Sequence, residues 1–182
     1  YTLFSEYVDV VPDPEKMTKV LRTVRRQISQ QAYEYIMVAA GSRQPDKADV
    51  IYHFIVYGFA LGSKVTEALH VPCVQRIFEI YRKARNEAHY FLEFIRFEEI
   101  SWQDHPVLYA VIEPENEVID MVADHFTDRL NPEWFIVYDK SHGKAAFHNP
   151  GRKWYLRRLE PEERQVLDEL EHSGGQEYAD LW

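Results

Sequence analysis

Arginine and histidine side chains recur along one flank of a segment between residues 74 and 92. Arg82, Arg85 and His89 are three and four residues apart, so they share a face if the segment is helical. Arg96 continues this ridge a little further along the chain. Arginines on one ridge can hold a phosphate bidentately, and a histidine beside them can donate a hydrogen bond or move a proton. The four residues are therefore candidates for a nucleic-acid contact.

Catalysis at this ridge needs a carboxylate partner. Glu113 and Asp139 each lie at the end of an expected strand and can supply one. We therefore name His89 and Glu113 as the candidate catalytic acid–base pair. The alternative is that the arginines form only structural ion pairs with nearby acids (Glu93, Glu98 and Glu99) or with the acidic helix that follows.

A second basic feature lies between residues 140 and 159. The chain has a formal net charge of −9, but this block has six cations and no acid: Lys140, Lys144, Arg152, Lys153, Arg157 and Arg158. Such a block predicts an electropositive surface suited to nucleic-acid phosphates. The alternative is a solvated hairpin face whose charge is neutralised by the acidic helix after it. Nearby aromatic residues can stack on exposed bases, although aromatic residues in strands more often belong to the core (Tyr138, Phe147, Trp154 and Tyr155).

Several other site types are excluded by their missing motifs. The chain has no glycine-rich phosphate loop, no dinucleotide fingerprint and no GxSxG elbow, which argues against an NTPase, a dinucleotide enzyme or an α/β-hydrolase. Asp124, His125 and Asp128 lack further ligands, so we predict no metal and no cofactor. The single cysteine, Cys73, excludes an internal disulfide and indicates a reducing, cytoplasmic compartment. No apolar run is long enough to span a membrane.

The residues that position these side chains form helices first and strands afterwards. The long helix, expected from Val74 to Leu92, has an apolar seam with helical spacing: Ile77, Tyr81, Ala84, Ala88 and Phe91. Lys83 and Glu87 are expected to form a surface ion pair on its other flank. Helices are also expected from Asp13-Pro14-Glu15 onwards and over residues 29–40, 47–61 and 64–69. The helix at 47–61 is apolar nearly all round, so we expect it to be buried, with Asp46 as its cap.

Alternation with a period of two predicts five strands over residues 94–100, 107–113, 134–138, 144–148 and 153–159. Helices are expected at 118–126 and 160–172. The order favours an α+β fold in one domain over 1–182: a helical half at 1–92, a mostly antiparallel sheet with one inserted helix at 93–159, and a C-terminal helix at 160–182. The chain begins at Tyr1, and residues 176–182 look like the first turn of another helix, so we expect truncation at both ends.

A family resemblance runs through most of the chain. Residues 85–91 (RNEAHYF) and 94–97 (FIRF) resemble the EAHRF…F.RF signature of an uncharacterised bacterial family labelled "probable DNA metabolism protein" or domain of unknown function. Similar matches occur at residues 108–114, 125–129 and 134–139, and upstream at Gly58, Gly62, Val65 and Pro72. Tyr90 departs from the family pattern, which commonly has arginine after the histidine.

The resemblance implies a context and no mechanism. Members of that family are typically encoded beside a radical-SAM protein labelled as putative DNA modification or repair, and some are fused to a uracil-DNA-glycosylase-like domain. No catalytic residues are established for the family. The favoured hypothesis is an accessory module of DNA repair or modification that contacts DNA, the radical-SAM protein or both. The alternatives are an enzyme acting on a modified or damaged base or nucleotide, and an adaptor that contacts only protein.

Overall fold

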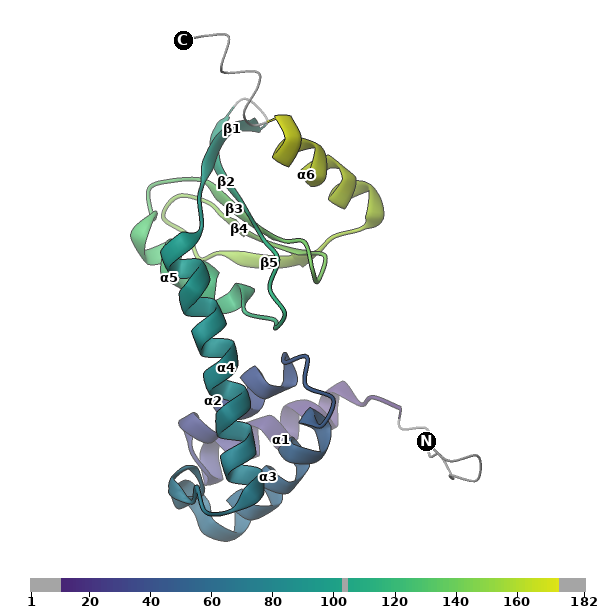
Figure 1. Cartoon of the computed structure of the whole chain (residues 1–182), viewed down its shortest axis with the longest axis vertical. Coiled ribbons are helices and arrows are strands. Elements are labelled where there is room, and N and C mark those ends of the chain that lie inside the picture. Colours follow the sequence, from purple (N-terminus) through teal and green to yellow (C-terminus); the bar gives the residue numbers. More distant parts are fainter. Residues whose placement is uncertain (1–10, 103–104, 174–182) are drawn as a thin grey trace.

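The computed structural model describes residues 11–102 and 105–173. The expected helical turn at 176–182 and both ends of the chain lie outside these residues. The molecule is elongated, with helices at one end, a sheet at the other, and one long helix running from the first end into the second (Figure 1). The α+β class expected from the order of elements is confirmed. No helix in the described part of the chain is long and apolar enough to cross a membrane.

The helical half packs around a single apolar core. Its elements are α1 (Pro14–Gln27), α2 (Gln30–Ala40), α3 (Lys47–Leu61), a 3-10 helix η1 (Gly62–Glu67) and the first turns of α4 (Pro72–Phe94). The core draws on every one of them, including Val24, Tyr35, Phe54, Val65 and Ile77. The ring of Tyr35 lies near the centre of this core, with the rings of Phe54, Phe78 and Tyr81 around it.

The expected helix caps had different outcomes. Asp13 caps α1 as expected, because its Oδ1 accepts hydrogen bonds from the backbone N–H groups of Glu15 and Lys16 at 3.1 and 3.0 Å. The expectation that Asp46 caps α3 is wrong. The Asp46 carboxylate instead accepts two hydrogen bonds from the guanidinium of Arg76 on α4, at 2.7 and 3.1 Å. A bidentate charged partner outcompetes the local backbone donors.

The expected burial of α3 is also wrong. Only Val50, Phe54 and Gly58 of this helix are buried, whereas other large apolar side chains are exposed: Tyr52, Val56, Tyr57, Phe59 and Leu61. The helix packs against α2 and α4 on one side. Composition predicted a buried helix because it counts apolar residues, while burial depends on how many neighbours surround the helix.

The sheet half contains one mixed sheet in the order β1-β2-β3-β4-β5. Its strands are β1 (Glu98–Trp102), β2 (His105–Ile112), β3 (Phe135–Asp139), β4 (Lys144–His148) and β5 (Tyr155–Arg158). Neighbouring strands are antiparallel except β2 and β3, which are parallel because α5 (Ile119–Arg129) connects them. Helix α5 packs on one face of the sheet and α6 (Pro161–Ser173) on the other (Figure 1).

The expected strand boundaries shift by one to four residues. The strand at 144–148 is confirmed, but the first strand begins at Glu98 and not at Phe94. The alternation from Phe94 to Phe97 was misleading, since α4 continues through Phe94 and residues 95–97 connect it to the strand. Most apolar residues from Phe91 to Phe97 pack in the core between α5 and the sheet, whether they belong to the last turn of α4 or to the connection after it. The helical and strand periodicities therefore overlap in this segment.

Helix α4 joins the two halves through a continuous apolar seam, as expected. Ile77 packs in the helical core, and Phe91 packs in the core between α5 and the sheet. Between these two cores, Ala84 and Ala88 are buried against Val118, which directly precedes α5. The two alanines allow close approach at the waist of the molecule because their side chains are small.

Candidate functional site

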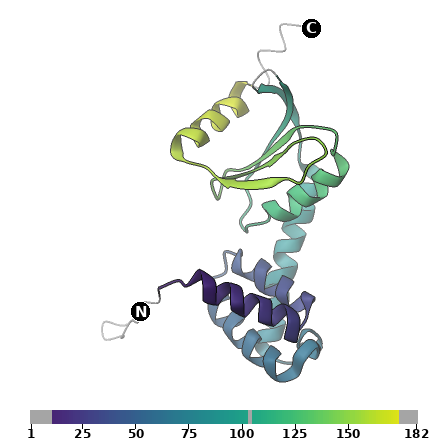
Figure 2. The same cartoon turned by 180° about the vertical axis from the view of Figure 1, so that it is seen from behind.

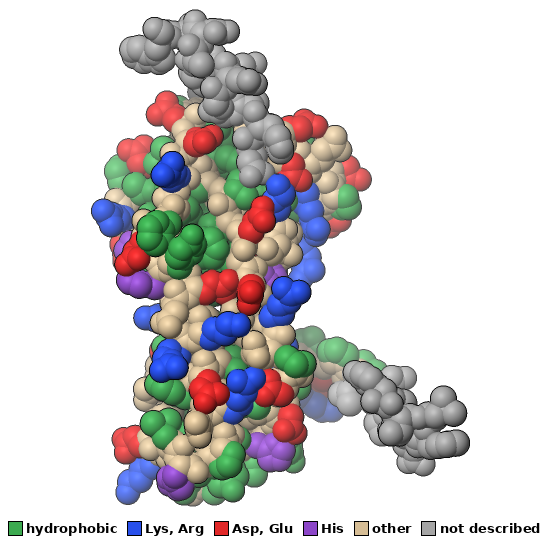
Figure 3. All heavy atoms as spheres, viewed as in Figure 1, with side chains coloured by type: hydrophobic (Ala, Val, Ile, Leu, Met, Phe, Trp, Pro, Cys, Tyr) green, Lys and Arg blue, Asp and Glu red, His purple; other side chains and the backbone are tan. Residues whose placement is uncertain are grey.

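A polar cleft of about 580 Å³ lies where the two halves meet. One wall is the connection between α2 and α3 together with the start of α3, from Gly41 to Lys47. The other wall combines the loop after β2 (Glu113–Glu117) with the turn after β3 (Ser141 and His142). Strands β2 and β3 are parallel and end level with each other at Ile112 and Asp139, so the segments that follow both strands meet at one edge. Charged side chains of both signs gather across this waist in Figure 3.

Asp139 and His142 form a hydrogen-bonded pair at this edge. Asp139 is the last residue of β3 and is fully buried. Its Oδ1 accepts the backbone N–H of His142 at 3.0 Å, and its Oδ2 lies 2.8 Å from His142 Nδ1. When Asp139 is ionised its carboxylate only accepts hydrogen bonds, and in that state Nδ1 carries the proton and donates it to Asp139. His142 lines the cleft with a side chain that is 22% exposed, and its Nε2 has no hydrogen-bond partner within the described residues.

Burial raises the pKa of the Asp139 carboxyl above its ordinary value. The hydrogen bonds from the backbone and ring of His142 and the positive charges of His142 and Lys144 oppose this increase and do not cancel it. A buried carboxylate that orients an imidazole is the arrangement used to hold a catalytic histidine in one tautomer. The pair therefore has the geometry of an acid–base centre, and we refer to it as the Asp139–His142 dyad.

Two cations line the cleft, Arg43 and Lys47 on the wall from the helical half, and a third, Lys144, pairs with the lining residue Glu117. Lys47 Nζ donates to the carbonyl oxygens of Ala40 and Ser42 at 2.8 and 2.7 Å, while the Arg43 side chain is exposed. Lys144 donates to Glu117 Oε2 at 2.5 Å. Burial acts to raise the pKa of the Glu117 carboxyl, but the hydrogen bond and charge of Lys144, with the charges of His142 and Lys47, outweigh it and the pKa is lowered. Glu117 is therefore ionised and paired at neutral pH.

The loop after β2 is held in place by Glu87 of α4. The Glu87 carboxylate accepts hydrogen bonds from the backbone N–H groups of Glu115 and Asn116, at 2.5 and 3.1 Å, and from Asn116 Nδ2 at 2.5 Å. The expected Lys83–Glu87 surface pair is wrong: Lys83 instead pairs with Glu115 Oε2 at 3.4 Å. Asn116 Oδ1 also accepts the backbone N–H of Arg43, so the loop connects both halves. Glu87 belongs to the RNEAHYF segment, so part of that signature has a structural role.

The candidate pair named from the sequence is not brought together at this cleft. Glu113 lines the cleft, whereas His89 lies outside its lining, is 71% exposed on α4 and has its Nε2 3.1 Å from Glu93. The sequence identified Asp139 as a possible partner carboxylate, but His142 was not among the candidate residues. The signal that was missed is the spacing Asp-x-x-His directly after a buried strand, which lets an aspartate bind both the backbone and the ring of the histidine.

The basic side chains named from the sequence fall into two groups. Three cations of the 140–159 block have acidic partners: Lys140 with Asp168 and Arg157 with Glu163, both on α6, and Lys144 with Glu117. The others are exposed and form no ion pair within the described residues: Arg82, Arg85, Arg96, Arg152, Lys153 and Arg158. Neutralisation by the acidic helix therefore accounts for part of the block.

The aromatic residues near this block are also divided. Tyr138 is buried in the core, and Trp154 donates its indole N–H to Asp124 at 2.6 Å. Phe147 and Tyr155 stack on each other at a centroid distance of 5.5 Å, with Arg157 over the phenylalanine ring. No group of three or more potential metal-binding side chains is found within the described ranges.

The fold and the cleft together define an α+β protein with a candidate acid–base centre between a helical half and a mixed sheet. The family described as Domain of unknown function (DUF4130) matches residues 45–182, which is well over half of the chain. The chain belongs to this family. A comparison with curated proteins found no match, and a comparison with solved structures found none either.

Proposed function

We propose that the protein binds a phosphate-bearing ligand, a nucleotide or nucleic acid, in the cleft and that His142 is its general acid or base. The observation that carries this proposal is the fully buried Asp139, which holds His142 Nδ1 at 2.8 Å and leaves Nε2 for the ligand. Asp139 is the positioning residue, since it fixes the tautomer of the ring that exchanges the proton. The enzyme hypothesis is thereby retained with the dyad in place of His89 and Glu113.

The charges of the cleft support an anionic ligand. Glu115 is paired with Lys83 and Glu117 with Lys144, so these two acids contribute little net charge. The lining residues left without an oppositely charged partner in the described ranges are Arg43 and Lys47 on one wall and Glu113 on the other. Arginine binds phosphate in a fork, and lysine binds it as a point charge. Glu113 can accept a hydrogen bond from a hydroxyl or amino group of the same ligand.

A histidine-based experiment tests this proposal without knowledge of the substrate. The ring signals of His142 are assigned in NMR spectra by comparison with His142→Gln, and mononucleotides and short DNA oligonucleotides are titrated in. We expect the His142 signals to shift with at least one of these probes and the signals of exposed His89 to stay in place. In Asp139→Asn, binding should persist while the ring-nitrogen signals of His142 change, because the buried charge is removed and the partner of Nδ1 is altered. Unmoved His142 signals with every probe would overturn the proposal.

A second candidate function is the accessory module of DNA repair or modification that the family resemblance implies. It is favoured by the exposed cations on α4 and beyond β4, including Arg82, Arg85, Arg152 and Lys153, which have no described acidic partner. These residues would contact DNA phosphates or the radical-SAM protein in the cytoplasm. Co-purification of the two proteins with and without nuclease separates a DNA-dependent association from a pure adaptor role, and loss of His142 should leave the association intact.

A further inference from the structure

Helix α1 is strongly basic on a protein that is acidic overall. Its sequence, PEKMTKVLRTVRRQ, contains five cations and one acid, a charge of +4 where the whole chain has −9. The helix lies on the surface of the helical half, nearest the viewer in Figure 2. It also precedes residue 45, where the family match begins, so the family assignment says nothing about it.

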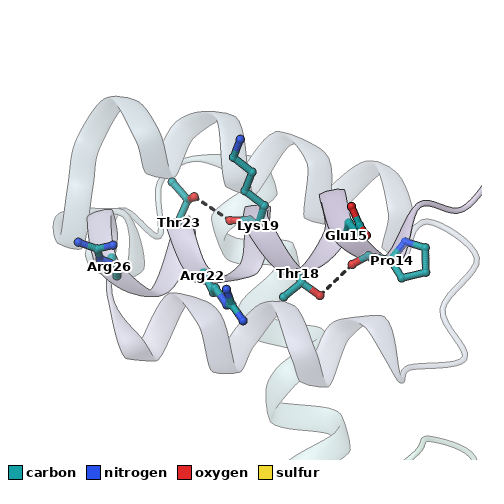
Figure 4. Close-up of a pocket in the computed structure, with 7 residues that line it drawn as sticks. All are labelled: Pro14, Glu15, Thr18, Lys19, Arg22, Thr23 and Arg26. Carbon is teal, nitrogen blue, oxygen red and sulfur yellow. Dashed lines mark hydrogen bonds between the residues drawn. The ribbon is translucent and has the colours of Figure 1, made fainter.

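Three of these cations form a row on the solvent face of α1. Lys19, Arg22 and Arg26 are spaced three and four residues apart, and all are exposed (Figure 4). We call them the α1 stripe. Within the described residues none of them has a carboxylate at ion-pair distance. Glu15 is the acid on the same face and lies at its beginning.

The rest of this face is polar. Thr18 lies before Lys19 and Thr23 after Arg22, and the two donate their hydroxyl protons to the carbonyl oxygens of Pro14 and Lys19, at 2.8 and 2.7 Å (Figure 4). The threonine oxygens therefore remain available only as acceptors, and the donors of this face are the three cations. An array of charged donors without apolar side chains selects for a charged ligand.

The solvent face and the core-facing side of α1 together indicate which kind of polyanion the helix can bind: a membrane surface, a protein or a nucleic acid. An interfacial helix inserts its apolar face into a membrane, but much of the apolar face of α1 is occupied by the core, where Val24 and Ile28 are buried and Leu21 is packed. Met17 and Val20 are the exposed apolar residues of this helix, and two such side chains make a small surface for insertion. Protein partners rely on apolar and aromatic anchors, which the stripe lacks. Protein–nucleic-acid interfaces are more polar and more positively charged than protein–protein interfaces. The stripe matches the last of these.

We propose that the α1 stripe binds the phosphate backbone of a nucleic acid independently of base sequence. With a helical rise of about 1.5 Å per residue, Lys19 and Arg26, which are seven positions apart, are separated by about 10 Å along the helix. Phosphates of one strand recur at about 3.4 Å along a duplex, so the row is long enough for about three of them. This surface is separate from the cleft and does not depend on the function proposed for the Asp139–His142 dyad.

The test compares two triple variants of the whole chain that lose the same charge. The stripe variant is Lys19→Gln with Arg22→Gln and Arg26→Gln; the control is Arg25→Gln with Lys64→Gln and Arg129→Gln, exposed cations outside both the stripe and the cleft. Glutamine is a good helix former, and circular dichroism checks that both variants are folded. Binding of labelled single-stranded and duplex DNA of mixed sequence is measured by fluorescence anisotropy over a series of salt concentrations.

We expect the stripe variant to bind DNA about tenfold to a hundredfold more weakly at low salt, and the slope of log K against log salt to fall by about two to three. The control should bind within about twofold of the natural chain, since its cations make no row. Equal losses in both variants, or no binding by the natural chain, would overturn the proposal. Polyglutamate is measured in the same way. If it binds as tightly as DNA and the stripe variant loses as much affinity for it, the proposal is overturned in favour of an acidic protein partner.

Discussion

Replacement of Glu87 by alanine tests how the cleft is assembled. The Glu87 carboxylate on α4 accepts hydrogen bonds from the backbone N–H groups of Glu115 and Asn116 and from the Asn116 side-chain amide. In Glu87→Ala these three donors lose their acceptor, and Asn116 is buried, so water reaches its groups poorly. The loop that contributes Glu113 and Glu117 to the cleft then keeps only the exposed Lys83–Glu115 ion pair as a polar contact with α4 within the described residues.

The size of the effect follows from these bonds. A net contribution of about 1.5 kcal/mol is reasonable for each hydrogen bond to a charged acceptor, and the two donors of Asn116 therefore account for about 3 kcal/mol. The N–H of Glu115 is on an exposed residue and adds less, about 0.5 kcal/mol. We expect Glu87→Ala to lower the free energy of unfolding by about 3 to 4 kcal/mol. This loss is large for a partly exposed residue, and its cause is the number of donors that converge on it.

Glu93→Ala is the matched control, because it makes the same substitution on the same helix. Glu93 pairs with His89 in an exposed i, i+4 arrangement, and its loss should cost less than about 0.5 kcal/mol. Urea unfolding followed by tryptophan fluorescence measures both variants, since Trp102, Trp134 and Trp154 lie in the sheet half. Losses that agree within about 0.5 kcal/mol would refute the structural role given to Glu87.

Two further predictions concern the turn after β3 and the Glu117–Lys144 pair. Gly143 has a φ of +61°, and a Cβ atom there would overlap the guanidinium of Arg164, whereas Gly151, with a φ of +69°, has open space around it. Both alanine variants carry the backbone strain, but only in Gly143→Ala must the Arg164 side chain move and lose its Nε hydrogen bond to the Leu159 carbonyl oxygen. Gly143→Ala should therefore be less stable than Gly151→Ala by about 1 kcal/mol in thermal unfolding, and equal values would contradict the contact. The folded pKa of Glu117 is lowered, so its ionised form stabilises the fold above the ordinary value of 4.5 and this contribution is lost as pH falls through the folded pKa. Glu117→Gln should therefore be less stable than the natural chain in neutral buffer and equally stable in strongly acidic buffer, and a deficit that persists in acid would show that the pair's charge is not the cause.

The order and type of the elements could be predicted from the sequence. Hydrophobic spacing is a local property, and it located α4 with its seam from Ile77 to Phe91, the Asp13 cap of α1 and the strand at 144–148. The α+β class followed from the same pattern. These features depend on neighbours a few residues away, so one chain without a structure is enough to reveal them.

Side-chain partners could not be predicted in this way. Asp46 binds Arg76 and does not cap α3, and Glu87 binds the loop after β2 and not Lys83. In both cases the partner that is close in space is about 30 residues away in the sequence. The exposure of the apolar side of α3 also depends on elements that are distant in the sequence. Periodicity reports that a face is apolar, but the number of elements packed against it depends on the whole fold.

The sequence by itself determined the fold class, the long helix that joins the two halves, the basic 140–159 block and the presence of carboxylates at the strand ends. Only the tertiary structure decided that Asp139 acts with His142, that Glu113 lies in the same cleft without His89, and that half of the basic block is paired with acids. The physical reason is that the crossover through α5 makes β2 and β3 parallel and aligns their ends. That alignment brings residues 113–117 and 141–142 to one edge, and hydrogen bonds of their backbone with the loop after β2 add residues 41–47. No local pattern in the sequence encodes these contacts.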